Sequence, residues 1–349
     1  MNKKRIKDYG ITIGSLPSGK LNNISDVDGV TVGHCTVDTE SHKTGVTVIL
    51  PTENNIFQHK LTASAYVLNG FGKTTGLPQI QELGTLESPI ALTNTLNVGL
   101  VQDALVDYMV NRCNRENVPL CSFNAIVGEC NDSSLNDICH RAVSKKHVYH
   151  AIETACKDFE QGDVGAGKGT ICFGMKGGIG SASRRIEVNG KCYTIGVLVQ
   201  SNFGRTEDLI IDGFPIGKII ADEIEPSVTD KGSIISVIAT DLPVSDRQLH
   251  RILKRAAIGL GRTGSHIGHG SGDIMIGFST ANTFSIENEN AFHTIQIIKE
   301  EKLDSAFQAV IEAEEEAVLN SMVAADSVTG WRGEIRQSIR PFLDKYLNQ

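Results

Sequence analysis

The stretch Gly-Ser-His-Ile-Gly-His-Gly-Ser-Gly-Asp-Ile-Met-Ile-Gly-Phe-Ser-Thr, from Gly264 to Thr280, leads from a loop of small residues into an apolar strand. Where the two meet, Ser271 stands between Gly270 and Gly272. Glycine adopts backbone conformations that other residues avoid and lets another group approach closely. The Ser271 hydroxyl can therefore attack the preceding carbonyl, although a glycine-rich turn before a buried strand explains the same pattern.

Two familiar motifs do not fit this stretch. The residues two positions from Ser271 are His269 and Asp273, so the G-x-S-x-G turn of hydrolases, which leads from a strand into a helix, is excluded. The run from His266 to His269 matches a nucleotide-binding tetrapeptide of one class of tRNA synthetases. That motif belongs near the start of a dinucleotide-type domain, and here it lies close to the C-terminus, so we interpret it as coincidence.

The composition is that of a soluble globular protein with a sizeable core. The chain has 349 residues, 40% of them apolar, and a net charge of −8. Nucleic-acid binding needs clustered Lys and Arg, which this acidic chain lacks. No window approaches the roughly eighteen apolar residues of a membrane span, and the basic N-terminus is followed by charged residues rather than an apolar export signal.

The metal-binding residue types show no spacing that indicates a metal site. Eight cysteines are scattered without C-x-x-C or zinc-site spacing. We expect reduced thiols in a cytoplasmic protein. His34, His266 and His269 are not arranged as a ligand set, so the sequence predicts no metal and no cofactor.

Apolar periodicity predicts a chain of mixed strands and helices. Alternation around Asp28-Gly29 predicts a β-hairpin. Further strands are predicted at 44–50, 169–173, 184–188, 193–200, 233–239, 274–278 and 293–298, and the stretch 126–132 is predicted to be a short strand that runs into polar residues. Helices are predicted at 100–110, 249–260 and 304–325, with one or two more within 135–156 and a partly helical tail at 331–349. No linker or repeat interrupts the chain, which favours a single domain.

Polar residues at strand ends are candidates for chemistry, and each has an alternative explanation. Glu129 ends a buried strand, where Asp132 can equally cap the next helix. Asn202 can aim its amide at a reacting oxygen or fold a turn. The glycine-rich run from Gly162 to Thr170 is similar to a phosphate loop, but Gly169 stands where Ser or Thr would hold magnesium, so we do not expect nucleotide binding.

Segments spread over nearly the whole chain carry a family resemblance. They are Ile24–Val27, Gly29–Val30, Val32–His34, Asn69–Gly76, Pro89–Thr95, Leu135–Ile138, Gly177–Gly180, Val199–Gly204 and Gly270–Ile274. In these segments the chain resembles the L-aminopeptidase/D-amidase/esterase family that includes the β-peptidyl aminopeptidases, also called the peptidase S58 or DmpA-like family. Together the matches are specific to the family but not to one substrate.

The resemblance implies an α+β fold, an α-β-β-α sandwich of the self-processing DmpA type that is similar to the N-terminal nucleophile hydrolases. It also implies an inactive precursor that cuts itself between Gly270 and Ser271. The single domain 1–349 would then consist of a large chain, 1–270, and a small chain, 271–349, that remain associated. A homo-oligomer, often a tetramer, is also implied.

The implied chemistry gives Ser271 two functions. A serine hydroxyl is a weak nucleophile without a neighbouring base. Cleavage would give Ser271 a free α-amine with an ordinary pKa of about 7.7 to 8.0, which can accept the hydroxyl proton. By the resemblance, the Asn202 amide stabilises the oxyanion, and Glu129 holds the ammonium group of the substrate. Asn131 stands where some members have a tyrosine.

The last long helix departs from the family pattern. There the family has Thr or Ser followed by two glutamates, and the hydroxyl and the second glutamate orient the nucleophile. This chain has Glu314-Glu315-Glu316, so Glu316 keeps its role and Glu314 replaces the hydroxyl. A second carboxylate near Ser271 would raise the pKa of its amine. A charged helix face is the alternative reading of all three glutamates.

The leading hypothesis is a self-processing N-terminal-serine aminopeptidase or amidase that acts on short peptides, amides or esters. One alternative is an acyltransferase of a related self-cleaving type that moves an acyl group between amines. Another is an uncleaved, non-catalytic binding homologue. The preference for α- or β-residues, or for D- or L-residues, depends on pocket shape and is not encoded in these motifs.

Overall fold

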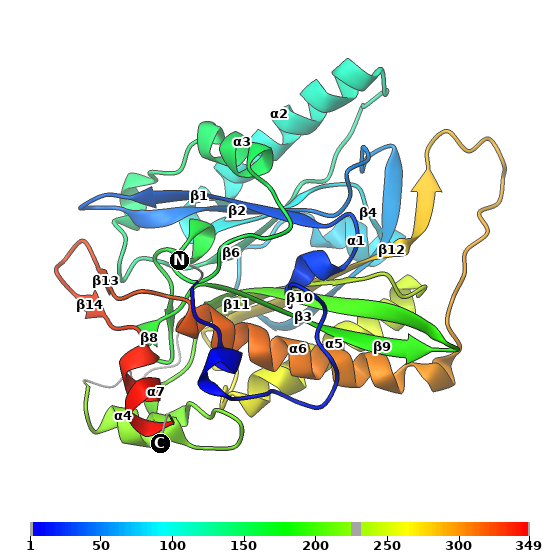
Figure 1. Cartoon of the computed structure of the whole chain (residues 1–349). Helices are drawn as coiled ribbons and strands as arrows, with labels where there is room; N and C mark the ends of the chain where they lie inside the picture. Colours follow the sequence, from blue (N-terminus) through cyan, green and yellow to red (C-terminus); the bar gives the residue numbers. More distant parts are fainter. Residues whose placement is uncertain (1–2, 225–231, 348–349) are drawn as a thin grey trace.

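Two stacked β-sheets, covered on their outer faces by helices, form the protein (Figure 1). The computed structural model describes residues 3–224 and 232–347. Helices α2 and α3 pack on the four-stranded sheet, and α5 and α6 pack on the six-stranded sheet. The α-β-β-α sandwich implied by the resemblance is therefore confirmed.

The strands pair in a mixed order. The four-stranded sheet has the order β1 (Thr31–Asp38), β2 (Lys43–Leu50), β5 (Ile90–Asn94) and β6 (Ile126–Cys130). The six-stranded sheet has the order β4 (Thr85–Leu86), β3 (His59–Gly70), β12 (Gly272–Ser285), β11 (Ser233–Thr240), β10 (Lys191–Asn202) and β9 (Ile179–Val188). Two short pairs are β7 (Ile171–Cys172) with β8 (Met175–Lys176), and β13 (Val328–Thr329) with β14 (Ile335–Arg336).

The helices are α1 (Leu77–Leu83), α2 (Val98–Glu116), α3 (Lys145–Glu153), α4 (Ile216–Ala221), α5 (Asp246–Arg262), α6 (Asp304–Val323) and α7 (Arg340–Tyr346). Within the described part of the chain, none of these helices combines the length and the apolar character that crossing a membrane requires.

Strand β12 lies inside the six-stranded sheet and positions the Ser271 junction. It runs antiparallel to β3 and parallel to β11, so that Gly272 pairs with Gly70 on one side and with Ser233 on the other. The strand begins directly after Ser271, two residues before the start that the apolar run predicted. Ser271 is therefore fixed at the end of a strand that is hydrogen bonded on both sides.

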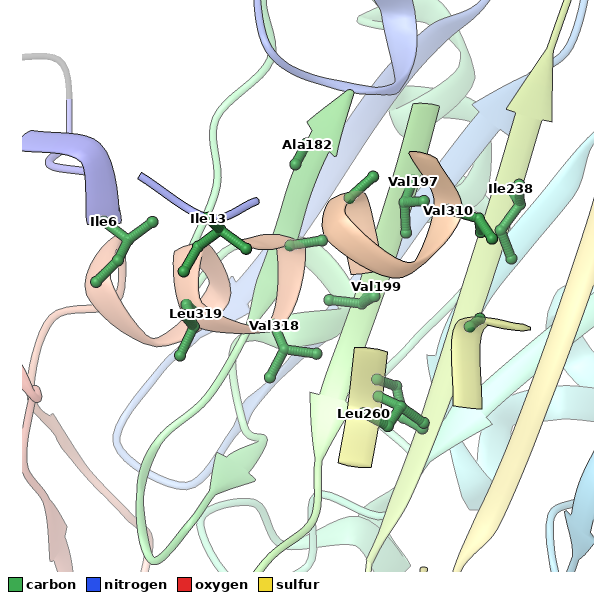
Figure 2. Packing of buried hydrophobic residues seen from close by; sticks show 14 of the residues in the cluster. Ile6, Ile13, Ala182, Val197, Val199, Ile238, Leu260, Val310, Val318 and Leu319 are labelled. Carbon is green, nitrogen blue, oxygen red and sulfur yellow. The ribbon is translucent and has the colours of Figure 1, made fainter. Parts of the chain in front are cut away.

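The core between α6 and the six-stranded sheet follows the strand alternation of β10. Val197 and Val199 face the helix layer, whereas Leu198 faces the other sheet. Figure 2 shows the α6 side chains Val310, Val318 and Leu319 in this layer, with Ile6 and Ile13 of the N-terminal segment beside them. Burial of each such side chain stabilises the fold by about 1.5–3 kcal/mol.

The hairpin predicted at Asp28-Gly29 is wrong. The segment Ile24–Asp26 forms a 3-10 helix, and β1 pairs with β2 instead of with a preceding strand. The local cause is side-chain capping: Asn23 Oδ1 accepts the Ser25 N–H at 2.8 Å, and Asp26 Oδ2 accepts the Asn23 N–H at 3.2 Å. These bonds satisfy the backbone locally and favour the helical turn.

The strand predicted at His293–Ile298 is also wrong, because this segment pairs with no strand among residues 3–224 and 232–347. Its backbone is held instead by isolated contacts. Asn282 accepts the Gln296 N–H at 3.0 Å and donates to the Gln296 carbonyl at 2.9 Å, and the Ile298 N–H donates to the Pro243 carbonyl at 2.8 Å. The apolar alternation was present, but a strand needs a partner.

Candidate active site

The backbone around Ser271 is tightly held and requires glycine. A Cβ atom on Gly272 would lie 2.6 Å from the Gly72 nitrogen, so no larger residue fits there. The Ser271 N–H donates to the Gly268 carbonyl at 2.9 Å, and the Gly272 N–H donates to the Gly232 carbonyl at 3.1 Å. The peptide bond between Gly270 and Ser271 is thus held between a tight turn and the first pair of the strand.

The Ser271 hydroxyl donates to a carboxylate that sequence reasoning did not select. Ser271 is 1% exposed, and its Oγ donates to Asp273 Oδ1 at 2.7 Å. The two residues are neighbours on one face of the chain, because alternate residues of a strand point the same way. The spacing of two residues between Ser271 and Asp273 was the signal available in the sequence. There, Asp273 was used only to exclude the G-x-S-x-G turn of hydrolases.

Asn69, at the end of β3, fixes the loop that precedes the serine. Its Nδ2 donates to the Gly268 carbonyl at 2.9 Å and to the Ser271 carbonyl at 2.6 Å. One amide thus joins the two sides of the turn. The sequence placed Asn69 in a family motif but assigned it no function.

Asn202, at the end of β10, presents its amide to the cavity described below. The backbone N–H of Ile171 donates to Asn202 Oδ1 at 3.0 Å. Because a backbone N–H can only donate, this contact fixes which end of the side chain carries oxygen. The Nδ2 group is therefore available to donate a hydrogen bond to a ligand in the cavity that Asn202 lines.

Glu129 lies near the end of β6 in the other sheet and is held at both carboxylate oxygens. The Lys73 N–H donates to Oε1 at 2.9 Å, and the Thr95 hydroxyl donates to Oε2. The residue is 1% exposed, yet it lines the same cavity as Asn202. Asn131 lies at the exposed rim, where its Oδ1 accepts the Ser133 N–H at 3.0 Å.

One cavity of about 1040 Å³ unites most of the predicted site. Its wall includes Gly270, Asn202, Glu129 and Asn131. Ser271 itself is buried and is not part of this wall, and its hydroxyl donates to Asp273. A candidate scissile bond, an oriented amide donor and a buried carboxylate therefore meet at the edge where the two sheets face each other.

Glu314 and Glu316 do not line this cavity. Glu314 accepts a hydrogen bond from the Ser236 hydroxyl at 2.5 Å, and Ser236 pairs with Met275 in β12. Met275 is four residues beyond Ser271, which is roughly 13 Å along a strand. The structure therefore does not place Glu314 where its charge would raise the pKa of a Ser271 amine.

Glu316 belongs to a buried ion cluster between α6 and the N-terminal segment. Its carboxylate lies 2.7 Å from Arg184 Nη2 and accepts a hydrogen bond from Asn22 Nδ2 at 2.6 Å. Glu312 binds the same arginine at 3.1 Å. These contacts hold the N-terminal segment to α6, and they do not bring Glu316 to Ser271.

Burial raises the pKa of Glu314 to about 8, because one carboxylate oxygen has only Ser236 as partner and the other has none within the described residues. Unfolding exposes this group, which then ionises near its ordinary value. The contribution of Glu314 to the free energy of unfolding is therefore most favourable below about pH 4.5. It becomes less favourable as the pH rises toward 8.

Glu314→Gln is expected to raise stability at neutral and alkaline pH, by roughly 3 kcal/mol at pH 7, with little change at pH 4. The reason is that glutamine never has to be protonated in the folded state. Urea unfolding of both proteins at several pH values measures the difference. Glu301→Gln, at an exposed position, controls for loss of a charge. Parallel stability curves for wild type and Glu314→Gln would contradict the buried neutral acid.

The glycine-rich run from Gly162 to Thr170 uses its lysine internally. Lys168 Nζ lies 2.8 Å from Asp38 and 3.0 Å from Asp163, both carboxylates. The nearby Lys176 donates to the carbonyls of Gly167 and Thr170 at 2.9 and 2.8 Å. Its burial lowers the pKa of Lys176 to about 7. These contacts shape the loop that presents the Ile171 N–H to Asn202, and they leave Lys168 paired with acids.

The three histidines considered as ligands lie apart. His34 contacts Thr47 Oγ1 at 2.9 Å and the Glu160 carbonyl at 3.0 Å. His266 lies 3.2 Å from Asp208, and His269 packs edge-on against Phe71 at the cavity. Each ring has a local partner.

Known proteins are similar to this chain over almost its whole length. The model of peptidase family S58 matches residues 22–336. The β-peptidyl aminopeptidase BapA of Sphingosinicella microcystinivorans is 37% identical, and the match covers 98% of this chain and 92% of that protein.

Solved structures share both the fold and the sequence. The PH0078 protein of Pyrococcus horikoshii OT3 superposes with a TM-score of 0.93 at 44% identity, covering 99% of this chain and 98% of that one. The L-aminopeptidase D-Ala-esterase/amidase of Ochrobactrum anthropi, described as a prototype of the serine aminopeptidases and a variant of the Ntn hydrolase fold, gives 0.90 at 34% identity, with 99% of each chain covered. The chain therefore belongs to peptidase family S58 and has the fold of an N-terminal-nucleophile hydrolase.

Proposed function

We propose that the protein is a self-processing aminopeptidase that uses Ser271 as its nucleophile and releases N-terminal residues from short peptides, amides or esters. The observation that carries this proposal is the shared cavity, where Gly270 of the candidate scissile bond meets Asn202 and Glu129. The relatives named as aminopeptidases support the same reaction class. This reading is favoured over an acyltransferase or a non-catalytic homologue.

The first reaction is cleavage of the chain itself. Before cleavage Ser271 has no free amine, so another group must accept the proton of its hydroxyl. Asp273 Oδ1, which accepts that hydrogen bond at 2.7 Å, takes this role. The Ser271 oxygen attacks the Gly270 carbonyl carbon, and the proton passes from Asp273 to the Ser271 nitrogen as the C–N bond breaks. Water then hydrolyses the resulting ester and leaves a Gly270 carboxylate and a Ser271 amine.

The second reaction uses the new amine as the base. With an ordinary pKa of about 7.7 to 8.0, the amine accepts the hydroxyl proton as Ser271 attacks the substrate carbonyl, and it returns the proton to the leaving amine. The Asn202 amide donates to the oxyanion, a contribution that is typically about 10²–10³ in rate. Water releases the acyl group from Ser271.

Glu129 gives the site its preference for an amino end. Its carboxylate is held by Lys73 and Thr95 and forms a fixed anionic partner for a substrate ammonium group. The catalytic serine then meets the first carbonyl of the peptide, so that one residue is removed at a time. Asn131, at the rim, contacts the part of the substrate that lies nearer to solvent.

Mass spectrometry of the denatured wild-type protein tests the proposal. We expect two polypeptides, residues 1–270 and 271–349, that copurify because β12 is hydrogen bonded to both β3 and β11. The same preparation should hydrolyse amino-acid p-nitroanilides. An intact chain without hydrolysis would favour the non-catalytic homologue, and faster acyl transfer to an added amine than to water would favour the acyltransferase. A cytoplasmic location is proposed from the scattered cysteines, and a tetramer from the family resemblance.

A further inference from the structure

Arg336, the last residue of β14, brings a positive charge to the wall of the cavity that also contains Glu129. Its ion-pair contact with Glu334 is long, at 3.8 Å, and involves a carboxylate whose side chain is 50% exposed. Such a pair contributes little. Within the described residues its Nε is buried without a hydrogen-bond partner. The guanidinium therefore retains donors that no group in the described part of the chain satisfies.

The backbone holds Arg336 at this wall from two sides. Its strand pairs with β13, and at the turn between the strands the Trp331 N–H donates to the Leu135 carbonyl at 3.1 Å. On the other side, the Lys176 N–H donates to the Gln337 carbonyl at 2.9 Å. The hairpin is thus attached both to the rim that carries Asn131 and to β8. The arginine is built into the cavity rather than placed on a free loop.

Lys73 is a second cation among the described residues that line the cavity, and its side chain is exposed. Lys73 Nζ donates to the Phe71 carbonyl at 2.7 Å and lies 4.5 Å from the centre of the Phe71 ring. Arg336 differs from Lys73 because, among the described residues, its Nε is buried without a hydrogen-bond partner, and Glu129 is the carboxylate held in place. Among the described residues, the cavity wall thus holds a cation and an anion that the fold keeps in place, which is complementary to a ligand with an ammonium and a carboxylate.

We propose that Arg336 binds the C-terminal carboxylate of a short peptide whose ammonium group is held by Glu129. The preferred substrates are then zwitterionic di- or tripeptides, ahead of the corresponding amides and anilides. A guanidinium binds a carboxylate through two parallel hydrogen bonds, which also orients the peptide. This inference rests on the proposed function and names the substrate class of the same site.

Matched pairs of peptides test the assignment. Each di- or tripeptide is assayed as the free acid and as the C-terminal amide, and the ratio of their kcat/KM values is compared between variants. The wild-type protein should favour the acid, mainly through KM. In Arg336→Gln this ratio should fall by about 10- to 100-fold, the usual cost of a charged hydrogen bond. Arg336→Lys keeps the positive charge but loses the planar guanidinium, so its ratio should lie between those of the wild type and Arg336→Gln.

Arg332→Gln provides the control on the same hairpin. Arg332 is exposed, stacks 4.3 Å from the Trp331 ring and does not line the cavity, so the wild-type ratio should persist. The inference is overturned if the wild-type ratio of kcat/KM for acid over amide is near one, or if Arg336→Gln leaves this ratio unchanged. In either case, hydrolysis of the amides would still support the proposed function. Failure to hydrolyse either form of any peptide overturns the proposed function itself.

Discussion

Ser271→Ala is expected to yield one intact polypeptide and to reduce aminopeptidase activity by at least about 10⁴-fold. Two losses coincide in this variant, because the hydroxyl that cuts the chain is also the nucleophile for substrate. Removal of the hydroxyl further prevents formation of the α-amine that serves as base. Denaturing gels and p-nitroanilide hydrolysis measure the two losses independently.

Ser279→Ala is the matched control for this variant. Ser279 lies in the same strand, is buried, and donates to the Leu242 carbonyl at 2.7 Å, so its loss tests the general effect of removing a buried hydroxyl. It should be cut and active. If Ser271→Ala were still cut at the same bond, or kept its activity, the assignment of the nucleophile would be wrong.

Asp273→Asn is expected to slow self-cleavage by about 10²–10⁴-fold, the usual contribution of a general base. Asparagine has nearly the same shape and can still accept the hydrogen bond from Ser271, but it does not take up the proton. The full-length precursor should therefore accumulate in a folded state. A time course of chain cleavage after synthesis in vitro, followed on denaturing gels, gives the rate.

Asp241→Asn separates this effect from the loss of any partly buried carboxylate. Asp241 follows the neighbouring strand β11 and accepts the Thr194 N–H at 2.6 Å, away from the cavity. Its substitution should leave the cleavage rate within about threefold of wild type, as expected for a group outside the reaction. Cleavage of Asp273→Asn at the wild-type rate would show that another group accepts the proton.

The sequence located much of the cavity because its groups lie at strand ends. Glu129 is the next-to-last residue of β6 and Asn202 is the last residue of β10, and both positions are visible as a polar residue after an apolar run. The sequence does not show that these strands belong to different sheets whose ends meet. The family resemblance supplied that arrangement, and the structure then placed both side chains on one cavity.

Helix geometry explains why the glutamates of α6 were harder to place. Two residues that are two positions apart on a helix are related by a rotation of about 200°, so their side chains point in nearly opposite directions. Glu314 and Glu316 therefore face different neighbours, Ser236 in the sheet and the Arg184 cluster beside the N-terminal segment. The family motif suggested that both glutamates act on Ser271, whereas the helical period directs their side chains to different partners. Their assigned role in orienting Ser271 has no direct contact to support it.

Arg336 escaped sequence reasoning for a different reason. It lies in a polar C-terminal segment with weak periodicity, where a short two-residue strand gives no pattern. Its position at the cavity depends on its neighbours in the chain: Trp331 is hydrogen bonded to Leu135 and Gln337 to Lys176, and both partners lie far earlier in the sequence. Only the folded structure brings such distant segments together.

The place of β12 has a consequence for assembly once the chain is cut as proposed. The strand would then belong to one polypeptide, while β3 and β11, which flank it, belong to the other. Recovery of the denatured mature enzyme becomes a bimolecular reaction whose yield depends on protein concentration, whereas the precursor folds as one molecule. Before cleavage, the covalent link between Gly270 and Ser271 thus holds β12 close to β3 and β11 at a high effective concentration. After cleavage, this help in folding is lost.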